Sequence, residues 1–288
     1  MNKDLRIAVI THEIDQFGPG YILHQLLEPW VSRGAKLEII SGPDADPPQA
    51  DLAISHIDMT KVEEEYTRYF DHYPLVINRK VRDVSKSVFS EQILGRDDSY
   101  QGPVIVKTDM NFGGMREIRA RYLKGDPNAA TDIQRPWRKI EFLPAYPMFN
   151  SSADVPLGVW RNPNLVVEKF RPERTEDGEY AVRMWIFLGD RGIYHQSFAA
   201  EPIVKGKNTV RRIVHDVAEV PEALRRKREQ LGMDFGKFDF GLVDGEVILY
   251  DVNRTPTLPP RGTQARKVLT LLPNLSEGLD YFIRKLQG

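Results

Sequence analysis

The chain has 288 residues, of which 41% are hydrophobic, and its 40 basic and 41 acidic residues give a net charge of −1. A balanced charge provides no polyelectrolyte attraction, which argues against nucleic acid as a partner. Cysteine is absent, which excludes disulfides, thiolate zinc sites and cysteine nucleophiles and restricts any metal to oxygen or imidazole ligands.

Membrane and secretion signals are not apparent in the sequence. No apolar run approaches the roughly 18 residues that cross a bilayer, and no apolar segment with a cleavage site follows the charged residues 1–6. We therefore expect no membrane partner and a cytoplasmic location. The oligomeric state is not set by the sequence, and a homodimer is compatible with it.

The first part of the chain alternates predicted strands and helices. Strands are expected at 5–11, 36–41, 51–55 and 74–78, and helices at 20–33 and about 61–72. This order predicts an open α/β layer of the doubly wound kind, which binds small molecules at the carboxyl ends of its strands. The glycines at 17–20 fit a plain turn better than a phosphate site, because the full dinucleotide fingerprint is missing.

After a predicted helix near 84–95 the pattern becomes rich in strands. They are expected at 103–107, 164–170, 180–188, 192–198, 236–243 and 246–252. This predicts an α+β second part. The loops of the segment 124–163, which contains Trp137 and several prolines, cannot be placed from pattern alone.

The stretch V-I-V-K-T-D-M-N-F-G-G-M, residues 104–115, predicts a phosphate-binding element. An inner strand ends at Lys107, so its ammonium group is expected where the strand leaves the sheet. Gly113 and Gly114 can present backbone N–H groups at close range because they have no Cβ. A solvated hairpin loop is the alternative interpretation.

Residues 235–256 predict a β-hairpin around Asp244-Gly245. An apolar face is expected from Phe238, Phe240 and Leu242 on one strand and from Ile248, Tyr250 and Val252 on the other. For the apolar side chains of both strands to lie on the same face, the residue numbers of cross-strand partners must sum to an even value. That condition favours a three-residue loop, 243–245, over a two-residue turn.

The same register brings Lys237, Asp239, Asp251 and Asn253 together on the opposite face of the hairpin. Two adjacent carboxylates repel each other by ~0.2–1 kcal/mol even in an ordinary sheet. Mg²⁺ would compensate, because it takes oxygen ligands and is usually held by one or two carboxylates together with substrate phosphates. A solvent-facing polar strand is the alternative.

In chain order, Lys107 with its glycine pair, the strand L-V-V-E-K-F at 165–170, Arg183 and the D-x(11)-D-x-N hairpin resemble the ATP-grasp superfamily. The arrangement is similar to that of glutathione synthetase, D-alanine:D-alanine ligase and ribosomal-S6-type glutamate ligases. The resemblance implies a Rossmann-like pre-ATP-grasp domain at 1–83 and a two-part ATP-grasp fold. Its small lid subdomain would span 84–170, and its large subdomain, 171–288, would carry the metal site.

The resemblance also implies roles for individual residues. Lys107 and, earlier in the chain, Lys86 would contact the phosphates of ATP. Glu168, Lys169 and Phe170 would surround the adenine, and Glu176 or Glu179 would bind the ribose. Asp239, Asp251 and Asn253 would hold Mg²⁺, while Lys237 and Arg183 would neutralise the transferring phosphoryl group.

The implied reaction is Mg²⁺-dependent, ADP-forming ligation of a carboxylate to an amine or another nucleophile through an acyl phosphate, on a small molecule or a peptide. Most ligases of the superfamily have glutamate where Asp251 stands, and an Asp-x-Asn ending is closer to inositol-polyphosphate kinases of the same fold. A kinase acting on a hydroxyl group and a non-catalytic ATP-binding protein therefore remain alternatives. The acceptor is expected near His12, His56 and Asp58, with Lys205, Arg211 and Arg212 as candidate contacts to an anion.

Overall fold

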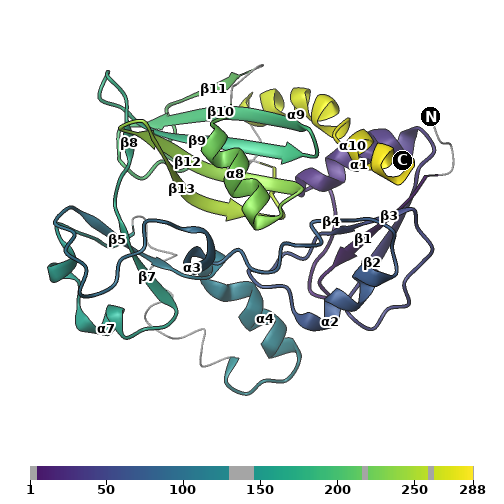
Figure 1. Ribbon diagram of the computed structural model, residues 1–288, viewed down its shortest axis with the longest axis horizontal. Helices are drawn as coiled ribbons and strands as arrows, with labels where there is room; N and C mark the ends of the chain where they lie inside the picture. Colours follow the sequence, from purple (N-terminus) through teal and green to yellow (C-terminus); the bar gives the residue numbers. More distant parts are fainter. Residues whose placement is uncertain (1–4, 130–145, 216–219, 259–262, 288) are drawn as a thin grey trace.

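The computed structural model describes residues 5–129, 146–215, 220–258 and 263–287. Within these residues the strands form three sheets of four, six and three strands, which lie around one central region (Figure 1). The protein is therefore a mixed α/β structure built of several sheets, in agreement with the expected fold class at that level.

The first sheet is formed by the first part of the chain and is parallel, with the strand order β2-β1-β3-β4. Its strands are β1 (Arg6–Thr11), β2 (Lys36–Ser41), β3 (Leu52–Ser55) and β4 (Val76–Ile77). Helix α1 (Ile22–Ser32) packs on one face through its apolar side chains, while α2 (Glu64–Thr67) and the 3₁₀ turn η1 (Arg68–Asp71) cover the other. The predicted α/β layer is confirmed in its strands.

The second sheet is small and has the order β6-β5-β7, with β5 (Val104–Thr108) between β6 (Met148–Phe149) and β7 (Leu165–Lys169). Short helices flank it, namely α3 (Lys86–Phe89) before β5 and α7 (Leu157–Trp160), preceded by the 3₁₀ turn η4 (Ser152–Asp154), before β7. After β5, the 3₁₀ turn η2 (Asn111–Gly114) leads directly into α4 (Met115–Leu123).

The third sheet is antiparallel and is the largest, with the order β11-β10-β9-β12-β13 and β8 paired to β9. Its strands are β8 (Glu173–Arg174), β9 (Tyr180–Leu188), β10 (Arg191–Ala199), β11 (Arg211–His215), β12 (Phe235–Val243) and β13 (Glu246–Asn253). Helix α8 (Glu222–Leu231) lies on one face over an aromatic core that contains Trp185, Phe187 and Phe238. On the other face, Ile186 and Leu188 pack in a second core with side chains of the C-terminal segment.

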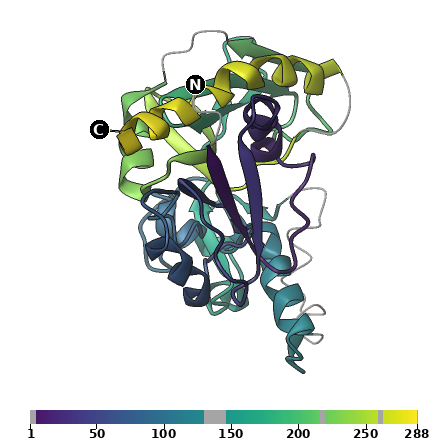
Figure 2. The same ribbon diagram turned by 90° about the vertical axis from the view of Figure 1, so that its right-hand side faces the viewer.

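The C-terminal helices α9 (Thr263–Ser276) and α10 (Leu279–Gln287) return to the first sheet and lie beside α1 (Figures 1 and 2). Their side chains Leu272 and Phe282 share one core with Leu26 of α1 and with Ile186 of β9. The first and third sheets are thus joined by a common apolar core, although they come from opposite ends of the chain.

Two predicted helices are wrong in extent. The helix expected at 84–95 is only the four residues of α3, and the one expected at about 61–72 is a single α-turn followed by a 3₁₀ turn. Residues 130–145, including Trp137, lie outside the described residues.

The hairpin turn differs from the prediction. Val243 pairs with Glu246, so the turn has two residues, Asp244 with φ +53° and Gly245 with φ +79°. The register shifts by one residue between Asp239 and Phe240. Beyond this shift the residue numbers of the cross-strand partners sum to an even value, as predicted. The prediction of a three-residue loop was wrong because a β-bulge, which periodicity alone does not reveal, inserts the extra residue.

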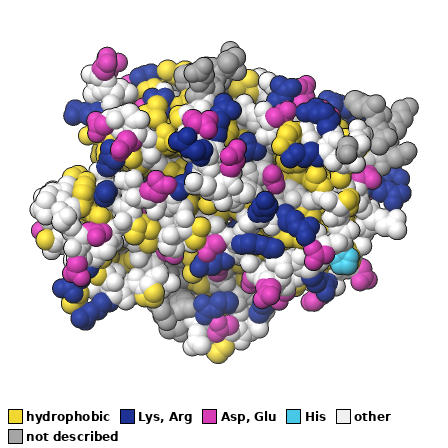
Figure 3. Space-filling model, viewed as in Figure 1, with side chains coloured by type: hydrophobic (Ala, Val, Ile, Leu, Met, Phe, Trp, Pro, Cys, Tyr) yellow, Lys and Arg dark blue, Asp and Glu magenta, His cyan; other side chains and the backbone are white. Residues whose placement is uncertain are grey.

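The described part of the chain contains no helix long and apolar enough to span a membrane. On the face drawn in Figure 3, basic and acidic side chains are interspersed. This distribution agrees with the net charge of −1.

Candidate functional site

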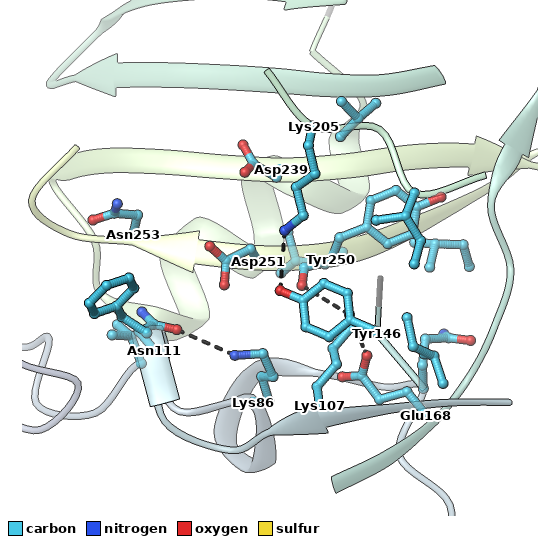
Figure 4. Close-up of a pocket in the computed structure, with 18 of the residues that line it drawn as sticks. Lys86, Lys107, Asn111, Tyr146, Glu168, Lys205, Asp239, Tyr250, Asp251 and Asn253 are labelled. Carbon is cyan, nitrogen blue, oxygen red and sulfur yellow. Dashed lines mark hydrogen bonds and ion pairs between the residues drawn. The ribbon is translucent and has the colours of Figure 1, made fainter. Parts of the chain in front are cut away.

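A cavity of about 500 Å³ lies between the small sheet and the large sheet. It reaches from the end of β7 to the exit of β13. The residues predicted for the site that line it are Lys86, Lys107, Glu168, Lys169, Phe170, Asp239, Asp251 and Asn253. Figure 4 shows Asp239, Asp251 and Asn253 on the hairpin strands and Lys86, Lys107 and Glu168 facing them from the small sheet and its neighbours. The two predicted motifs therefore meet across one cavity.

The carboxylates of Asp239 and Asp251 belong to directly opposed residues of β12 and β13. Lys237 Nζ lies 3.0 Å from Asp239 Oδ2, whereas Asp239 Oδ1 is buried and has no hydrogen-bond partner among the described residues. Burial raises the pKa of Asp239, and the neighbouring Asp251 adds to this against the opposing effect of Lys237. The pair is therefore short of positive charge and of hydrogen-bond donors.

These residues fit a magnesium ion. The two carboxylates supply anionic oxygen ligands, which match the one or two that Mg²⁺ usually takes from a protein. Asn253 lies next to them on β13, and its Oδ1 accepts a hydrogen bond of 2.8 Å from Thr255 N–H. The hydroxyl of Thr255 lies 3.5 Å from the same oxygen but only 2.6 Å from Asp58 Oδ1, to which it donates its single proton. A carbonyl oxygen has a second lone pair, so Asn253 can still act as a ligand. No group of three or more His, Cys, Asp or Glu residues with metal-site geometry occurs in the described ranges.

Three lysines in the cavity wall have no carboxylate within 4 Å among the described residues, namely Lys86, Lys169 and Lys205. Lys86 is buried, and its Nζ lies 3.5 Å from Asn111 Oδ1. Lys205 Nζ lies 3.1 Å from the hydroxyl of Tyr146 and points between the two sheets (Figure 4). Lys205 was predicted only as a candidate acceptor contact, because its loop carries no motif.

Lys107 and Glu168, predicted to contact phosphate and adenine respectively, form an ion pair with each other. Lys107 Nζ lies 2.7 Å from Glu168 Oε2, and both side chains are largely buried. The pairing follows from the sheet, since β5 and β7 are adjacent antiparallel strands and place both side chains on the cavity face. Glu168 Oε1 is buried without a hydrogen-bond partner in the described residues.

The part of the cavity near the end of β7 is lined with apolar groups. They come from Ile105, Phe170, Pro172, Ala181, Ile248 and Leu249. A slot of this kind, with a few polar groups at its edge, is typical of a small-molecule site. Ile248 and Tyr250 line the cavity rather than the core side of the hairpin, and the structure corrects the prediction for both. The two-residue turn pairs Phe240 with Leu249 and so places Leu249 on the core side of the hairpin.

Arg183 lies outside the cavity. Arg183 precedes Met184 on β9, and Met184 pairs with Asp239. Because side chains alternate along a strand, Arg183 points to the face of the sheet opposite to Asp239. There its guanidinium binds both oxygens of the buried Glu173, with an Nε–Oε2 distance of 2.8 Å, and donates to the hydroxyl of Tyr194. The predicted phosphate contact is replaced by a structural ion pair that alternation along β9 could have indicated.

Neither candidate for the ribose lines the cavity. Glu176 is exposed in the turn between β8 and β9, and Glu179 accepts a hydrogen bond of 2.9 Å from Nε of Arg211. The structure therefore brings neither glutamate into the cavity where the resemblance implies a ribose contact.

The glycine pair does not line the cavity. Gly113 and Gly114 are buried and have φ values of +64° and +67°, and Phe112 before them also has a positive φ of +49°. From this segment the cavity is lined by Asn111 and Phe112. The left-handed turn thus aims two side chains at the cavity, and the glycines allow the backbone conformation that this requires.

The first sheet closes the other end of the cavity. Among the residues expected there, only Asp58 lines the cavity, where it accepts hydrogen bonds from Tyr21 (2.9 Å) and Thr255 (2.6 Å) and lies 3.2 Å from Arg116. His12 and His56 are buried outside it. Burial lowers the pKa of His56 to about 3, so this imidazole is neutral.

No family model and no curated protein sequence matches this chain. Among solved structures it is similar to a RimK domain protein described as ATP-grasp from Sphaerobacter thermophilus, with 12% identity, 95% of this chain and 98% of the other covered, and a TM-score of 0.47. A D-alanine–D-alanine ligase from Bacillus anthracis gives 11% identity, 98% and 97% coverage and a TM-score of 0.42.

A third similar structure is a RiPP-associated ATP-grasp ligase from Chryseobacterium gregarium, with 8% identity, coverages of 96% and 95% and a TM-score of 0.43. That ligase is in complex with ADP and with a leader and core peptide. Over nearly its whole length the chain is thus similar to solved ATP-grasp proteins and ligases, at identities and scores too low to carry their activities over to it.

Proposed function

We propose that the protein belongs with the ATP-grasp ligases and is a Mg²⁺-dependent, ADP-forming ligase. It would join a carboxylate of a small molecule or peptide to an amine or another nucleophile through an acyl phosphate. The observation that carries this proposal is the single cavity in which Asp239 and Asp251 face lysines that have no carboxylate partner among the described residues. A magnesium-bound triphosphate would satisfy both sets of charges at once.

The nucleotide would lie along the cavity with its base in the apolar slot at the end of β7. Glu168 and the backbone around Lys169 border that slot, and Phe170 forms part of its wall. Lys86, Lys107 and Lys205 would then reach the phosphates. Because the Lys107 ammonium already binds Glu168, nucleotide binding would place it between a carboxylate and a phosphate.

Asp239, Asp251 and Asn253 would hold the magnesium, which neutralises negative charge on the phosphates when bound. The substrate carboxylate would attack the γ-phosphorus as the bond from that phosphorus to ADP breaks. An amine would then attack the acyl carbon, expel phosphate and lose a proton. The protein contributes positioning and charge neutralisation rather than a side-chain nucleophile.

The acceptor would bind at the first-sheet end of the cavity. Asp58, Arg116, Thr255 and Thr257 line this end and provide both donors and acceptors of hydrogen bonds. The division into a pre-ATP-grasp domain at 1–83, a lid at 84–170 and a large subdomain at 171–288 belongs to the same proposal. The three separate sheets support it.

The test is ADP release with Mg²⁺ and pools of amino acids, hydroxy acids and polyols. Release that depends on a carboxylate and an amine supports the ligase. Release that depends on a polyol would instead support a kinase, the candidate that an aspartate at position 251 favours. Nucleotide binding without any turnover would leave only an ATP-binding protein.

Asp251→Asn removes one proposed ligand and should lower Mg²⁺-dependent turnover by at least about 100-fold, the size typical of losing one electrostatic stabiliser. Asp244→Asn is the matched control, because it makes the same change in the exposed turn of the same hairpin. Equal activity of the two variants would contradict the metal assignment.

A further inference from the structure

The hairpin that carries the two carboxylates contains one extra residue. From the turn onward the pairs are Val243 with Glu246 and Phe240 with Leu249, and the register then shifts, so that Asp239 pairs with Asp251. Tyr250 is therefore the unpaired residue of a β-bulge on β13.

The bulge decides which face of the sheet Asp251 occupies. If the pairing continued unshifted from the turn, Asp251 would lie opposite Phe238, whose side chain is fully buried in the aromatic core under α8. A one-residue shift moves every following side chain to the other face. The insertion of Tyr250 thus places Asp251 beside Asp239 in the cavity and returns Val252 to the core.

The side chain of Tyr250 holds the bulge to a segment outside the hairpin. Its hydroxyl donates a hydrogen bond of 2.9 Å to the carbonyl oxygen of Arg171 and accepts one of 3.1 Å from the N–H of Glu173. These residues lie between the small sheet and β9. A tyrosine hydroxyl can make both bonds at once, so the position of Tyr250 is fixed from two directions.

The facing strand leaves room for this side chain. A Cβ built on Gly241 would lie 2.2 Å from the hydroxyl oxygen of Tyr250 and 2.8 Å from Cζ, which is closer than real atoms approach. Glycine at this position of β12 is therefore required by the tyrosine of β13. Tyr250 and Gly241 therefore act together. The two hydrogen bonds of the tyrosine hydroxyl form what we call the clamp, and the missing Cβ of Gly241 leaves room for the ring.

The backbone of the bulge also contacts the small sheet. Lys107 Nζ lies 3.5 Å from the carbonyl oxygen of Tyr250, so the bulge is in contact with the lysine on β5 as well as next to the carboxylate on β13. One residue thereby links the two halves of the cavity.

We propose that Tyr250 is a positioning residue, whose clamped bulge sets the separation of Asp239 and Asp251 and their placement relative to Lys107. This inference rests on the proposed function, since it assumes that the two carboxylates bind the metal of a metal–nucleotide complex.

Tyr250→Phe removes the clamp and keeps the ring, and Gly241→Ala displaces the ring from the other strand. Binding of Mn²⁺ in the presence of ADP, followed by electron paramagnetic resonance, measures the metal site without turnover. We expect Mn²⁺ affinity to fall by about 10-fold or more in each variant, as when a residue that orients a metal ligand is lost. ADP affinity in EDTA should change little.

Tyr73→Phe is the matched control, because it removes a tyrosine hydroxyl that donates a 3.0 Å hydrogen bond to the carbonyl of Pro48, far from the cavity. A purely structural role of Tyr250 would lower the unfolding midpoint as Tyr73→Phe does and leave Mn²⁺ affinity unchanged. That result in both Tyr250→Phe and Gly241→Ala, together with lost Mn²⁺ binding in Asp251→Asn, would overturn the inference and leave the proposed function intact. Absence of ADP-dependent Mn²⁺ binding in the wild-type protein would overturn both.

Discussion

At the scale of single residues, the site depends on charges that are compensated in different ways. Lys107 and Glu168 form an ion pair, and Lys237 lies 3.0 Å from one carboxylate oxygen of Asp239, whereas the other oxygen, Oδ1, is buried without a hydrogen-bond partner among the described residues. Buried charges without partners are costly in a folded protein. Such a residue in a cavity therefore indicates a missing ligand more strongly than a paired one does.

The Lys107–Glu168 pair leads to a prediction about stability. Lys107→Met should lower the free energy of unfolding by about 3–5 kcal/mol, because it leaves Glu168 buried and unpaired. The double variant Lys107→Met/Glu168→Gln should recover most of this loss and still bind ATP weakly. Urea unfolding and calorimetric titration with ATP measure the two effects.

The control for this pair is Lys61→Met, which breaks the more exposed ion pair with Asp83 and should change stability by less than about 1 kcal/mol. If the double variant were as unstable as the single one, the loss would come from packing rather than from an unpaired charge. Wild-type ATP affinity in the double variant would remove Lys107 from the nucleotide site.

At the scale of elements, the hairpin shows how local backbone geometry controls the site. A two-residue turn with positive φ at both positions matches the twist of the flanking strands. Beyond the bulge at Tyr250, the strands pair in the same register that a three-residue loop would produce. The predicted pairing of Asp239 with Asp251 is therefore confirmed, although the predicted turn is wrong.

Gly245→Ala should therefore lower the free energy of unfolding by about 1–2 kcal/mol, because a side chain disfavours the left-handed region. Its Cβ would meet no atom within 4 Å, so the cost comes from the backbone alone. Gly18→Ala is the control, since that glycine has equally open space and no positive φ. Equal stability of the two variants in urea would show that the turn relaxes to another form.

At the scale of the whole molecule, the C-terminal helices hold the first and third sheets together. Arg254 contributes from inside, where its buried guanidinium donates to the carbonyl oxygens of Met59, Thr60 and Val81. The residue that follows Asn253 thus anchors the exit of the hairpin to the first layer.

Leu272→Ala in α9 should lower the free energy of unfolding by about 2–5 kcal/mol, as expected for a buried leucine. Because its core includes residues of both sheets, amide exchange should accelerate together in β1 and β9. Leu269→Ala, on the exposed side of the same helix, should have a small effect. Faster exchange in β9 alone would show that residues 1–83 form an independent unit.

Much of the fold followed from local pattern. The inner strands β1, β3 and β5 are apolar on both faces, and β9, β10, β12 and β13 have the β-branched and aromatic residues that suit a sheet, so their positions were predictable to within one or two residues. The helices α2 and α3 are shorter than the sequence predicts, because helical propensity is a weak local preference that tertiary contacts override.

The sequence by itself determined which residues could share a face, because side-chain alternation is a property of the strand. This was sufficient to bring Lys237, Asp239, Asp251 and Asn253 together and to predict Lys107 at the end of its strand. Only the tertiary structure decided that Lys205 enters the cavity from a loop and that Tyr250 forms a bulge. Those outcomes depend on contacts between segments distant in the chain, whose packing energies leave no periodic trace in the sequence.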